Sequence, residues 1–216
     1  MNNRLGRKII FFIIILFLPF SLIYIFSKGS QHYKRLPFLG PAQSDSTPFV
    51  FSDFSFRTSD GRIIDKKDLQ GKILIVTALN STCPGNCLLA ANPFKLEVYN
   101  LIQDKDFADV VILSELLDTN EVPFNLMHEK MKVDPERWTI FTTAHNPFWD
   151  VELNGSVLRE TPDPDSKVAM FYPRAILLVD TSFRPRGFYD GAETIEIKRL
   201  IDELRLLKKE YDQKLN

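Results

Sequence analysis

The only two cysteines of this chain, Cys83 and Cys87, lie four residues apart in the short segment CPGNC. The preceding residues 71–80 are almost all apolar and predict a buried strand that leads into this segment. Apolar residues then recur at helical spacing to about Gln103. A strand, a dithiol loop and a helix form a layout in which the helix N-terminus lowers the pKa of a nearby thiol. The layout indicates thiol–disulfide exchange or soft-metal binding, with a structural disulfide as the alternative.

An apolar segment near the N-terminus predicts a membrane anchor. Residues Ile9–Phe26 carry no charge, and their length of eighteen residues is about the shortest that spans a bilayer as a helix. The basic residues Arg4, Arg7 and Lys8 favour a cytoplasmic N-terminus, which places the rest of the chain outside the cytoplasm. In a Gram-negative cell this is the periplasmic side of the inner membrane. A cleaved signal peptide is the alternative, although its apolar core is usually only ~7–15 residues long.

Composition divides the chain into an anchor at 1–28, a linker at 29–48 and one domain at 49–216. Four of the 27 basic residues lie in the anchor, which leaves 23 basic against 28 acidic residues, a net charge of −5. This is an ordinary solubilising charge without the basic stripe of a nucleic-acid-binding protein, so we expect no nucleic-acid partner.

The pattern of apolar residues predicts an α/β fold. A β-hairpin is expected to begin within residues 49–56 and to turn at 59–62. Further strands are expected at 72–80, 109–114, 138–142 and 175–179, with an edge strand at 187–189. A short helix is expected at 124–133, and a final amphipathic helix from about Glu193. Strands that alternate with helices predict a thioredoxin-like sheet, here with an N-terminal hairpin extension.

Several segments together resemble the Sco/SenC family. They are LPFLGP at 36–41, DFSF at 53–56 followed by DG at 60–61, LQGK at 69–72, CPxxC at 83–87, RWTIFT at 137–142 and AILLVD at 175–180. The resemblance covers residues 36–210, and the three-residue spacer between the cysteines is its most specific part. It implies a membrane-anchored, thioredoxin-fold protein that assists assembly of the copper site of cytochrome c oxidase.

This resemblance implies that Cys83 and Cys87 carry Cu(I), reduce the cysteines of an oxidase copper-site subunit or other thiol protein, or do both. The family also supplies a copper-ligand histidine just before its late strand. In this chain that position falls on Tyr172 or a direct neighbour, and residues 168–174 contain no histidine. Leu88 also replaces the proline that usually follows the second cysteine. A phenol is a poor ligand for soft Cu(I), so the usual copper site is incomplete.

Of the three histidines, His32, His128 and His145, the last is the best substitute ligand. It follows the strand at 137–142, and a loop there can approach the dithiol in a thioredoxin-like fold. A polar loop residue without a metal is the alternative.

Thiol–disulfide exchange needs no third ligand. By analogy with thioredoxin, Cys83 is the attacking thiolate and Cys87 resolves the mixed disulfide. A general extracytoplasmic thiol–disulfide oxidoreductase without stable copper is therefore the second functional hypothesis. A degenerate binding module that keeps only the fold is the third.

Overall fold

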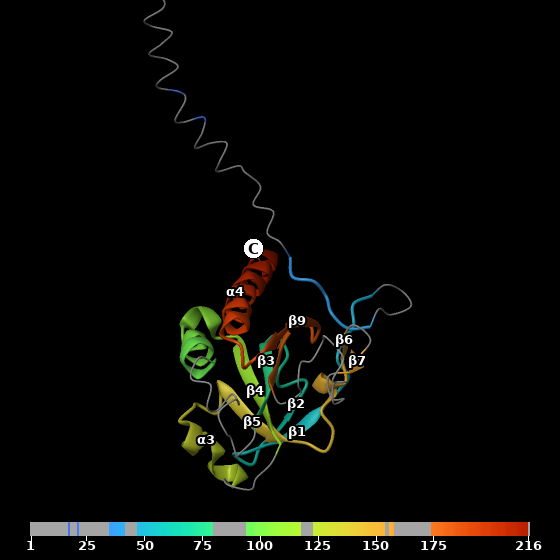
Figure 1. Ribbon diagram of the computed structural model, residues 1–216, viewed down its shortest axis with the longest axis vertical. Coiled ribbons are helices and arrows are strands. Elements are labelled where there is room, and N and C mark those ends of the chain that lie inside the picture. Colours follow the sequence, from blue (N-terminus) through green and yellow to red (C-terminus); the bar gives the residue numbers. More distant parts are fainter. Residues whose placement is uncertain are drawn as a thin grey trace, which may run out of the picture. The chain divides into compact units, whose positions relative to one another are not determined.

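The computed structural model describes residues 35–41, 47–79, 94–117, 123–153, 156–157 and 174–215, together with Phe17 and Ser21. The chain divides into two units, 1–34 and 35–216. The second unit holds a central sheet with helices packed beside it (Figure 1).

Seven strands form this sheet in the order β2-β1-β5-β4-β3-β8-β9. Their bounds are β1 Ser55–Thr58, β2 Ile63–Asp65, β3 Ile73–Leu79, β4 Val110–Leu116, β5 Trp138–Thr142, β8 Ala175–Val179 and β9 Pro185–Asp190. The neighbours β3, β4 and β5 are parallel, whereas β8 and β9 are antiparallel to their neighbours. The order β4-β3-β8-β9 with this mixture of directions is the thioredoxin arrangement. A separate antiparallel pair consists of β6 Glu152–Leu153 and β7 Ser156–Val157.

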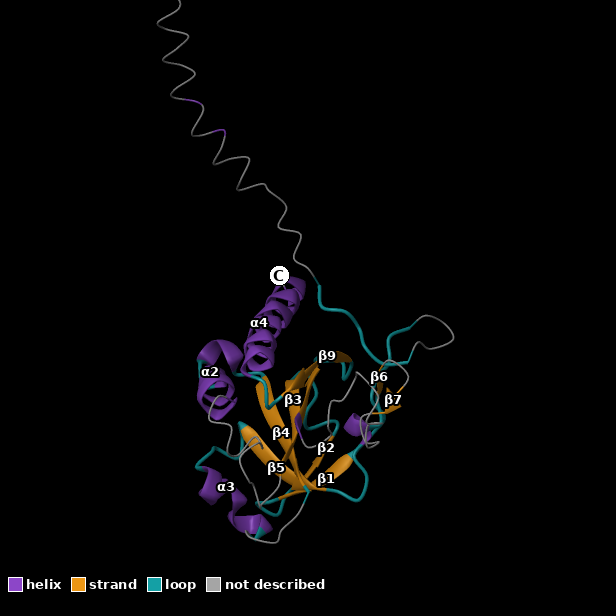
Figure 2. Ribbon diagram, viewed as in Figure 1, coloured by secondary structure: helices purple, strands orange, loops and turns teal. Residues whose placement is uncertain are grey.

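The helices gather mainly beside one part of the sheet (Figure 2). They are the π-helical turns η1 Phe94–Tyr99, the continuing α2 Asn100–Ile102, the 3-10 turns η2 Lys105–Phe107, η3 Phe124–Leu126 and η4 Pro147–Trp149, α3 Met127–Met131 and the long α4 Thr194–Leu215. The helices α2 and α4 lie side by side in Figure 2.

Both faces of β3 are buried, and each face contributes to a different core. Ile73, Ile75 and Leu79 pack with the apolar side chains of η1, α2 and α4. Leu74 and Val76 point to the opposite face, where they join a cluster rich in phenylalanine. Burying one such aliphatic side chain stabilises the fold by about 1.5–3 kcal/mol. This double burial explains why the sequence of β3 is continuously apolar rather than alternating.

The α/β and thioredoxin-like fold is therefore confirmed for the described domain, and most strands lie within two residues of their expected positions. The hairpin turn is also where it was expected, but the preceding strand is shorter. Ser55 begins β1, whereas residues 49–54 run outside the sheet because Phe51 and Phe54 are buried in the phenylalanine-rich core.

The predicted anchor Ile9–Phe26 lies outside the described residues, apart from Phe17 and Ser21. Within the part of the chain that is described, no helix has both the length and the apolar character required to cross a bilayer.

Candidate functional site

The strand β3, which precedes the dithiol in the sequence, ends beside its parallel neighbours at one edge of the sheet. Since β3, β4 and β5 are parallel, their carboxyl ends meet there, and Leu79 pairs with Leu116. The backbone N–H of Leu117 donates to the carbonyl of Leu79 over 2.8 Å, which continues the pairing beyond both strands. Cys83 follows Leu79 by four residues. We call this end of the sheet the carboxyl edge. Cys83 and Cys87 themselves lie outside the described residues.

The start of β8 lies at the same carboxyl edge. This strand is antiparallel to β3, and Ile176 pairs with Thr77. Arg174, just before β8, forms an ion pair with Asp190 at the end of β9. Residues 168–173, which precede Arg174 in the sequence and include the candidate position Tyr172, lie outside the described residues as well. The fold thus places the end of β3 beside the start of β8, although 96 residues of sequence separate Leu79 from Ala175.

The helical segment that follows the dithiol in the sequence packs against the sheet from its first described residue, Phe94. Phe94 is fully buried, and its ring meets Trp138 of β5 edge to face at 5.4 Å. Val98 and Ile102 extend this buried face along η1 and α2. The expected helical end near Gln103 is confirmed, because α2 ends at Ile102. In the sequence, the dithiol segment therefore lies between a buried strand and a helical segment that has one buried face.

A buried polar cluster lies under the loop that follows β5. Glu115, one residue before the end of β4, accepts hydrogen bonds from Asn146 Nδ2 at 2.8 Å and from Trp149 Nε1 at 2.6 Å. Asn146 Oδ1 accepts in turn from the backbone N–H of Phe148 and caps the turn η4. The cluster fixes the loop 143–151 against the carboxyl edge. Sequence reasoning missed it, although an acidic residue inside an apolar strand was a usable signal.

His145 projects from this loop into solvent. Its Nε2 lies 2.9 Å from Asp150 Oδ2, and 67% of its side chain is exposed. Thr143 Oγ1 donates to the carbonyl of His145 over 2.9 Å, which tightens the turn. The expected position after β5 is confirmed. Among the residues that the structure describes, no group of three His, Cys, Asp or Glu side chains could hold a metal ion.

His128 has a structural environment. It lies on α3, where its Nε2 donates to the carbonyl of Trp138 over 2.9 Å. Its Nδ1 accepts a hydrogen bond from Ser59 Oγ in the hairpin turn. Burial is the largest influence on the pKa of His128 and lowers it, although the carbonyl of Trp138 acts in the opposite direction. Both ring nitrogens make hydrogen bonds, so this histidine links α3 to the hairpin turn and to β5 and is not a metal ligand.

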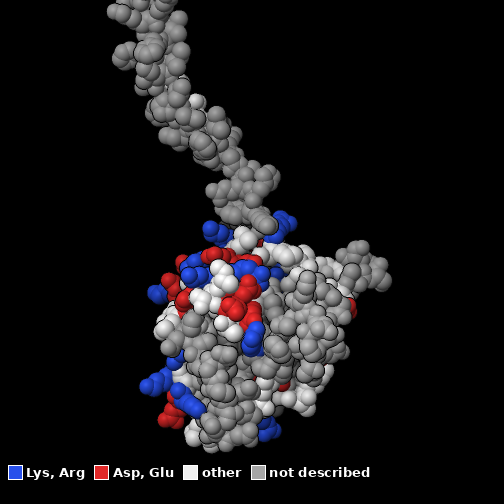
Figure 3. Space-filling view, viewed as in Figure 1, with Lys and Arg blue, Asp and Glu red and all other residues white. Residues whose placement is uncertain are grey.

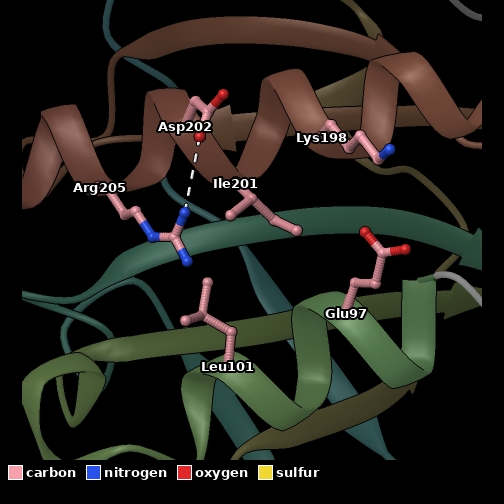
Figure 4. Close-up of a pocket in the computed structure, with 6 residues that line it drawn as sticks. All are labelled: Glu97, Leu101, Lys198, Ile201, Asp202 and Arg205. Atoms are coloured by element: carbon pink, nitrogen blue, oxygen red, sulfur yellow. Dashed lines mark ion pairs between the residues drawn. The ribbon is translucent and has the colours of Figure 1, made fainter.

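A shallow groove of about 420 Å³ separates α4 from η1 and α2 (Figure 4). Leu101 and Ile201 face each other in it, and an ion pair between Arg205 and Asp202 lies at its rim at 3.6 Å. On the face shown in Figure 3, basic and acidic side chains are interspersed over the described surface. Neither the groove nor this distribution of charges indicates a particular class of ligand.

Comparison with solved structures shows which proteins share this fold. BsSco, a member of the Sco family of cytochrome c oxidase assembly proteins described with a disulfide switch, matches with a TM-score of 0.55 and 14% identity over 81% of this chain and 98% of its own. A SCO1/SenC family lipoprotein from Bacillus anthracis str. Ames gives a TM-score of 0.53 and 17% identity over 74% and 95%. ScoI from Arabidopsis thaliana, solved with copper bound, gives 0.50 and 20% over 76% and 99%.

At these identities the matches establish a shared fold, and the proteins that share it include Sco/SenC family members. No protein-family model matches the sequence, and no curated protein matches it.

Proposed function

We propose that this chain is a membrane-anchored, extracytoplasmic assembly factor for the copper site of cytochrome c oxidase, acting through Cys83 and Cys87. One observation carries the proposal: β3 and β8, which flank the two expected site segments, meet at the carboxyl edge of a fold shared with Sco proteins. The CPGNC segment, which follows β3 in the sequence, supplies the proposed dithiol. The oxidase copper-site subunit is the proposed partner.

The dithiol can reduce the cysteines of such a target in two steps. The Cys83 thiolate attacks one sulfur of a target disulfide, forms a mixed disulfide and releases one target thiolate. The Cys87 thiolate then attacks Cys83 Sγ, which forms the Cys83–Cys87 disulfide and releases the second target thiolate. Two electrons pass to the target, and an external dithiol reductant must regenerate the pair. The exposed, reduced target site can then accept copper.

Cu(I) is the proposed cargo, held by the two thiolates. Two soft sulfur ligands suit Cu(I) in near-linear coordination, whereas the phenol of Tyr172 adds little. The donor set therefore fits a weak copper carrier better than a tight one. For this reason a general thiol–disulfide oxidoreductase without stable copper is the second candidate function.

A Cu(I) titration of the reduced protein with a chromophoric competitor separates these functions. We expect wild type to bind one Cu(I), Cys83→Ser to lose binding, and Tyr172→His to bind about tenfold more tightly because an imidazole is added. If wild type binds no Cu(I) and Tyr172→His does, copper carriage by this chain is excluded and the redox function remains.

The reduction potential of the pair, measured on the same samples, tests the redox step. A potential near those of known exchange proteins supports reduction of a target. A potential below about −300 mV instead indicates a stable structural disulfide that cellular thiol pools do not readily reduce, and contradicts a role in reversible thiol exchange.

A further inference from the structure

A cavity of about 540 Å³ lies at the amino ends of the parallel strands. Among its lining residues, Lys72 directly precedes β3, Ala108 lies two residues before β4, and Arg137 directly precedes β5. The cavity is therefore at the opposite end of the sheet from the carboxyl edge. The seven residues of β3 separate the two ends by about 20 Å.

The connection between β2 and β3, residues 66–72, forms one wall of this cavity. The two strands are consecutive in the sequence, but β1, β5 and β4 lie between them in the sheet. The connection must therefore pass three strands before it reaches β3. It does so on the face of the phenylalanine-rich core, because Leu69 is buried in that core. The cavity lies between this connection and the first residues of β4 and β5.

The floor of the cavity is apolar. Leu69 and Val111 are buried in the phenylalanine-rich core, and Ile64 packs against it. The buried Thr139 also lines the floor, but its Oγ1 already donates to the carbonyl of Pro135 over 3.0 Å. The floor therefore suits the apolar body of a ligand better than a polar group.

Two cationic side chains line the cavity on either side of the start of β4. Lys72 and Arg137 occupy these positions because β3, β4 and β5 are neighbours in the sheet. Arg137 is held in place by two hydrogen bonds of 2.8 Å, from NH1 to the carbonyl of Ala108 and from NH2 to the carbonyl of Phe107. Two strand spacings, about 10 Å, separate the two backbones, so both long side chains can reach one small anion between them.

The acidic residues of the cavity already have other partners. Arg62, a third cation of the lining, pairs with Asp60 at 2.7 Å, and the charge of Glu136 also acts on it. Asp68 Oδ2 accepts a hydrogen bond of 2.9 Å from the backbone N–H of Asp65. These contacts leave the positive charges of the other two cations without a compensating carboxylate.

Among the residues that the structure describes, none with an acidic side chain forms an ion pair with Lys72 or Arg137. We propose that this cavity binds a small organic acid, with its carboxylate between these two side chains and its apolar body on the floor. Charge-assisted hydrogen bonds to a carboxylate are strong. The volume of the cavity is also typical of a small-molecule site. This site is separate from the proposed dithiol function and does not depend on it.

Titration calorimetry of the full chain in a neutral detergent tests the proposal. The probes are pentanoate, pentan-1-ol and pentylamine, which share an apolar body and differ in charge. The heat of each probe added to protein-free micelles is subtracted. We expect pentanoate to bind with a Kd of about 1 mM, the alcohol to bind at least about tenfold more weakly, and the amine not to bind.

Lys72→Met removes one charge and keeps a side chain of similar length. We expect it to weaken pentanoate binding about tenfold, because a charged hydrogen-bond donor is lost. Lys72→Arg keeps the charge and should bind within about threefold of wild type. Lys67→Met is the matched control, since Lys67 is an exposed lysine of the same connection and does not line the cavity.

Ala108→Phe tests the position of the site without a change of charge. Ala108 is exposed, so the larger ring can enter the cavity while the core stays intact. We expect this variant to lose pentanoate binding and to keep the circular dichroism spectrum of wild type.

Loss of binding in Lys72→Met and Ala108→Phe, with binding kept in Lys72→Arg and Lys67→Met, supports the proposal. No saturable binding in wild type, equal binding of pentanoate and pentan-1-ol, or unchanged binding in Lys72→Met overturns it. A chain that binds pentanoate in this way, but neither binds Cu(I) nor reduces a disulfide, keeps the acid site and contradicts the proposed function.

Discussion

At the scale of single residues, His128 makes the stability of the domain depend on pH. Burial lowers its pKa, while Asp60 and Asp134 raise it and Arg62 lowers it further. The unfolded chain has a histidine pKa of about 6.5, so the unfolded state binds the extra proton first. The stabilisation is complete above that value and is lost as the pH falls below it toward the folded pKa.

We therefore expect the free energy of unfolding to fall as the pH drops below about 6.5, and this fall to shrink in His128→Asn. Urea denaturation at pH 7.5, 6 and 5 measures the slope. An identical slope in His128→Asn would show that other groups are responsible.

Glu115 tests whether the loop after β5 depends on its buried polar cluster. Replacement by alanine leaves the donors Asn146 Nδ2 and Trp149 Nε1 without this acceptor, at a cost of about 3 kcal/mol in unfolding free energy. Glu115→Gln retains one acceptor oxygen and should cost only about 1 kcal/mol. Urea denaturation compares them, and equal losses for the two variants would contradict the role of the hydrogen bonds.

The copper ligand set gives a further prediction at this scale. The imidazole of His145 is exposed and already pairs with Asp150 at 2.9 Å. We expect His145→Ala to change Cu(I) affinity by less than about threefold, because the two thiolates carry the binding. Competitive titration beside Cys83→Ser measures this, and a loss approaching that of Cys83→Ser would identify His145 as a ligand.

Some features of single residues can be predicted from the sequence, whereas their long-range contacts cannot. The cysteine spacing and the absence of histidine at 168–174 could be read directly from the chain. The partners of Glu115 could not, because they come from a loop 31 and 34 residues away. The same holds for Ser59 and His128, which are 69 residues apart. Such contacts depend on the packing of elements, which local patterns do not encode.

At the scale of elements, α4 was predictable because its apolar stripe repeats over many turns. Leu200, Leu204 and Leu207 are fully buried, as the pattern indicates. The first strand was less predictable. Residues 49–54 have the alternation and aromatic content of a strand, but Phe51 and Phe54 pack into the core outside the sheet. Tertiary packing overrides local propensity there.

The stripe of α4 provides a matched pair of substitutions. Leu204 is fully buried against the sheet, whereas Leu206 is only partly buried. We expect Leu204→Ala to lower the unfolding free energy by about 3 kcal/mol and Leu206→Ala by about 1 kcal/mol. Chemical denaturation distinguishes them. Similar losses would mean that α4 packs on the sheet through a different face.

At the scale of the whole molecule, the folded domain extends further toward the N-terminus than the expected boundary at residue 49 implies. Leu36 is in the core, and Arg186 donates hydrogen bonds to the carbonyls of Leu36 and Pro37. We expect a protein that begins at residue 35 to be about 3 kcal/mol more stable than one that begins at residue 49, because the shorter chain exposes part of the core and leaves Arg186 without two acceptors. Thermal and urea unfolding of both test this, and equal stability would show that the segment adds nothing to the fold.

The pairing of Ile176 with Thr77 also bears on how such a protein can change over time. Side chains on both faces of the sheet fix this register, whereas the connections that bear the expected chemistry begin beyond it. Substitutions at the edge therefore need not be compensated in the core. The same scaffold can therefore carry different sets of ligand side chains in these connections. A substitution such as Tyr172→His can therefore change the candidate donor set while the scaffold stays intact.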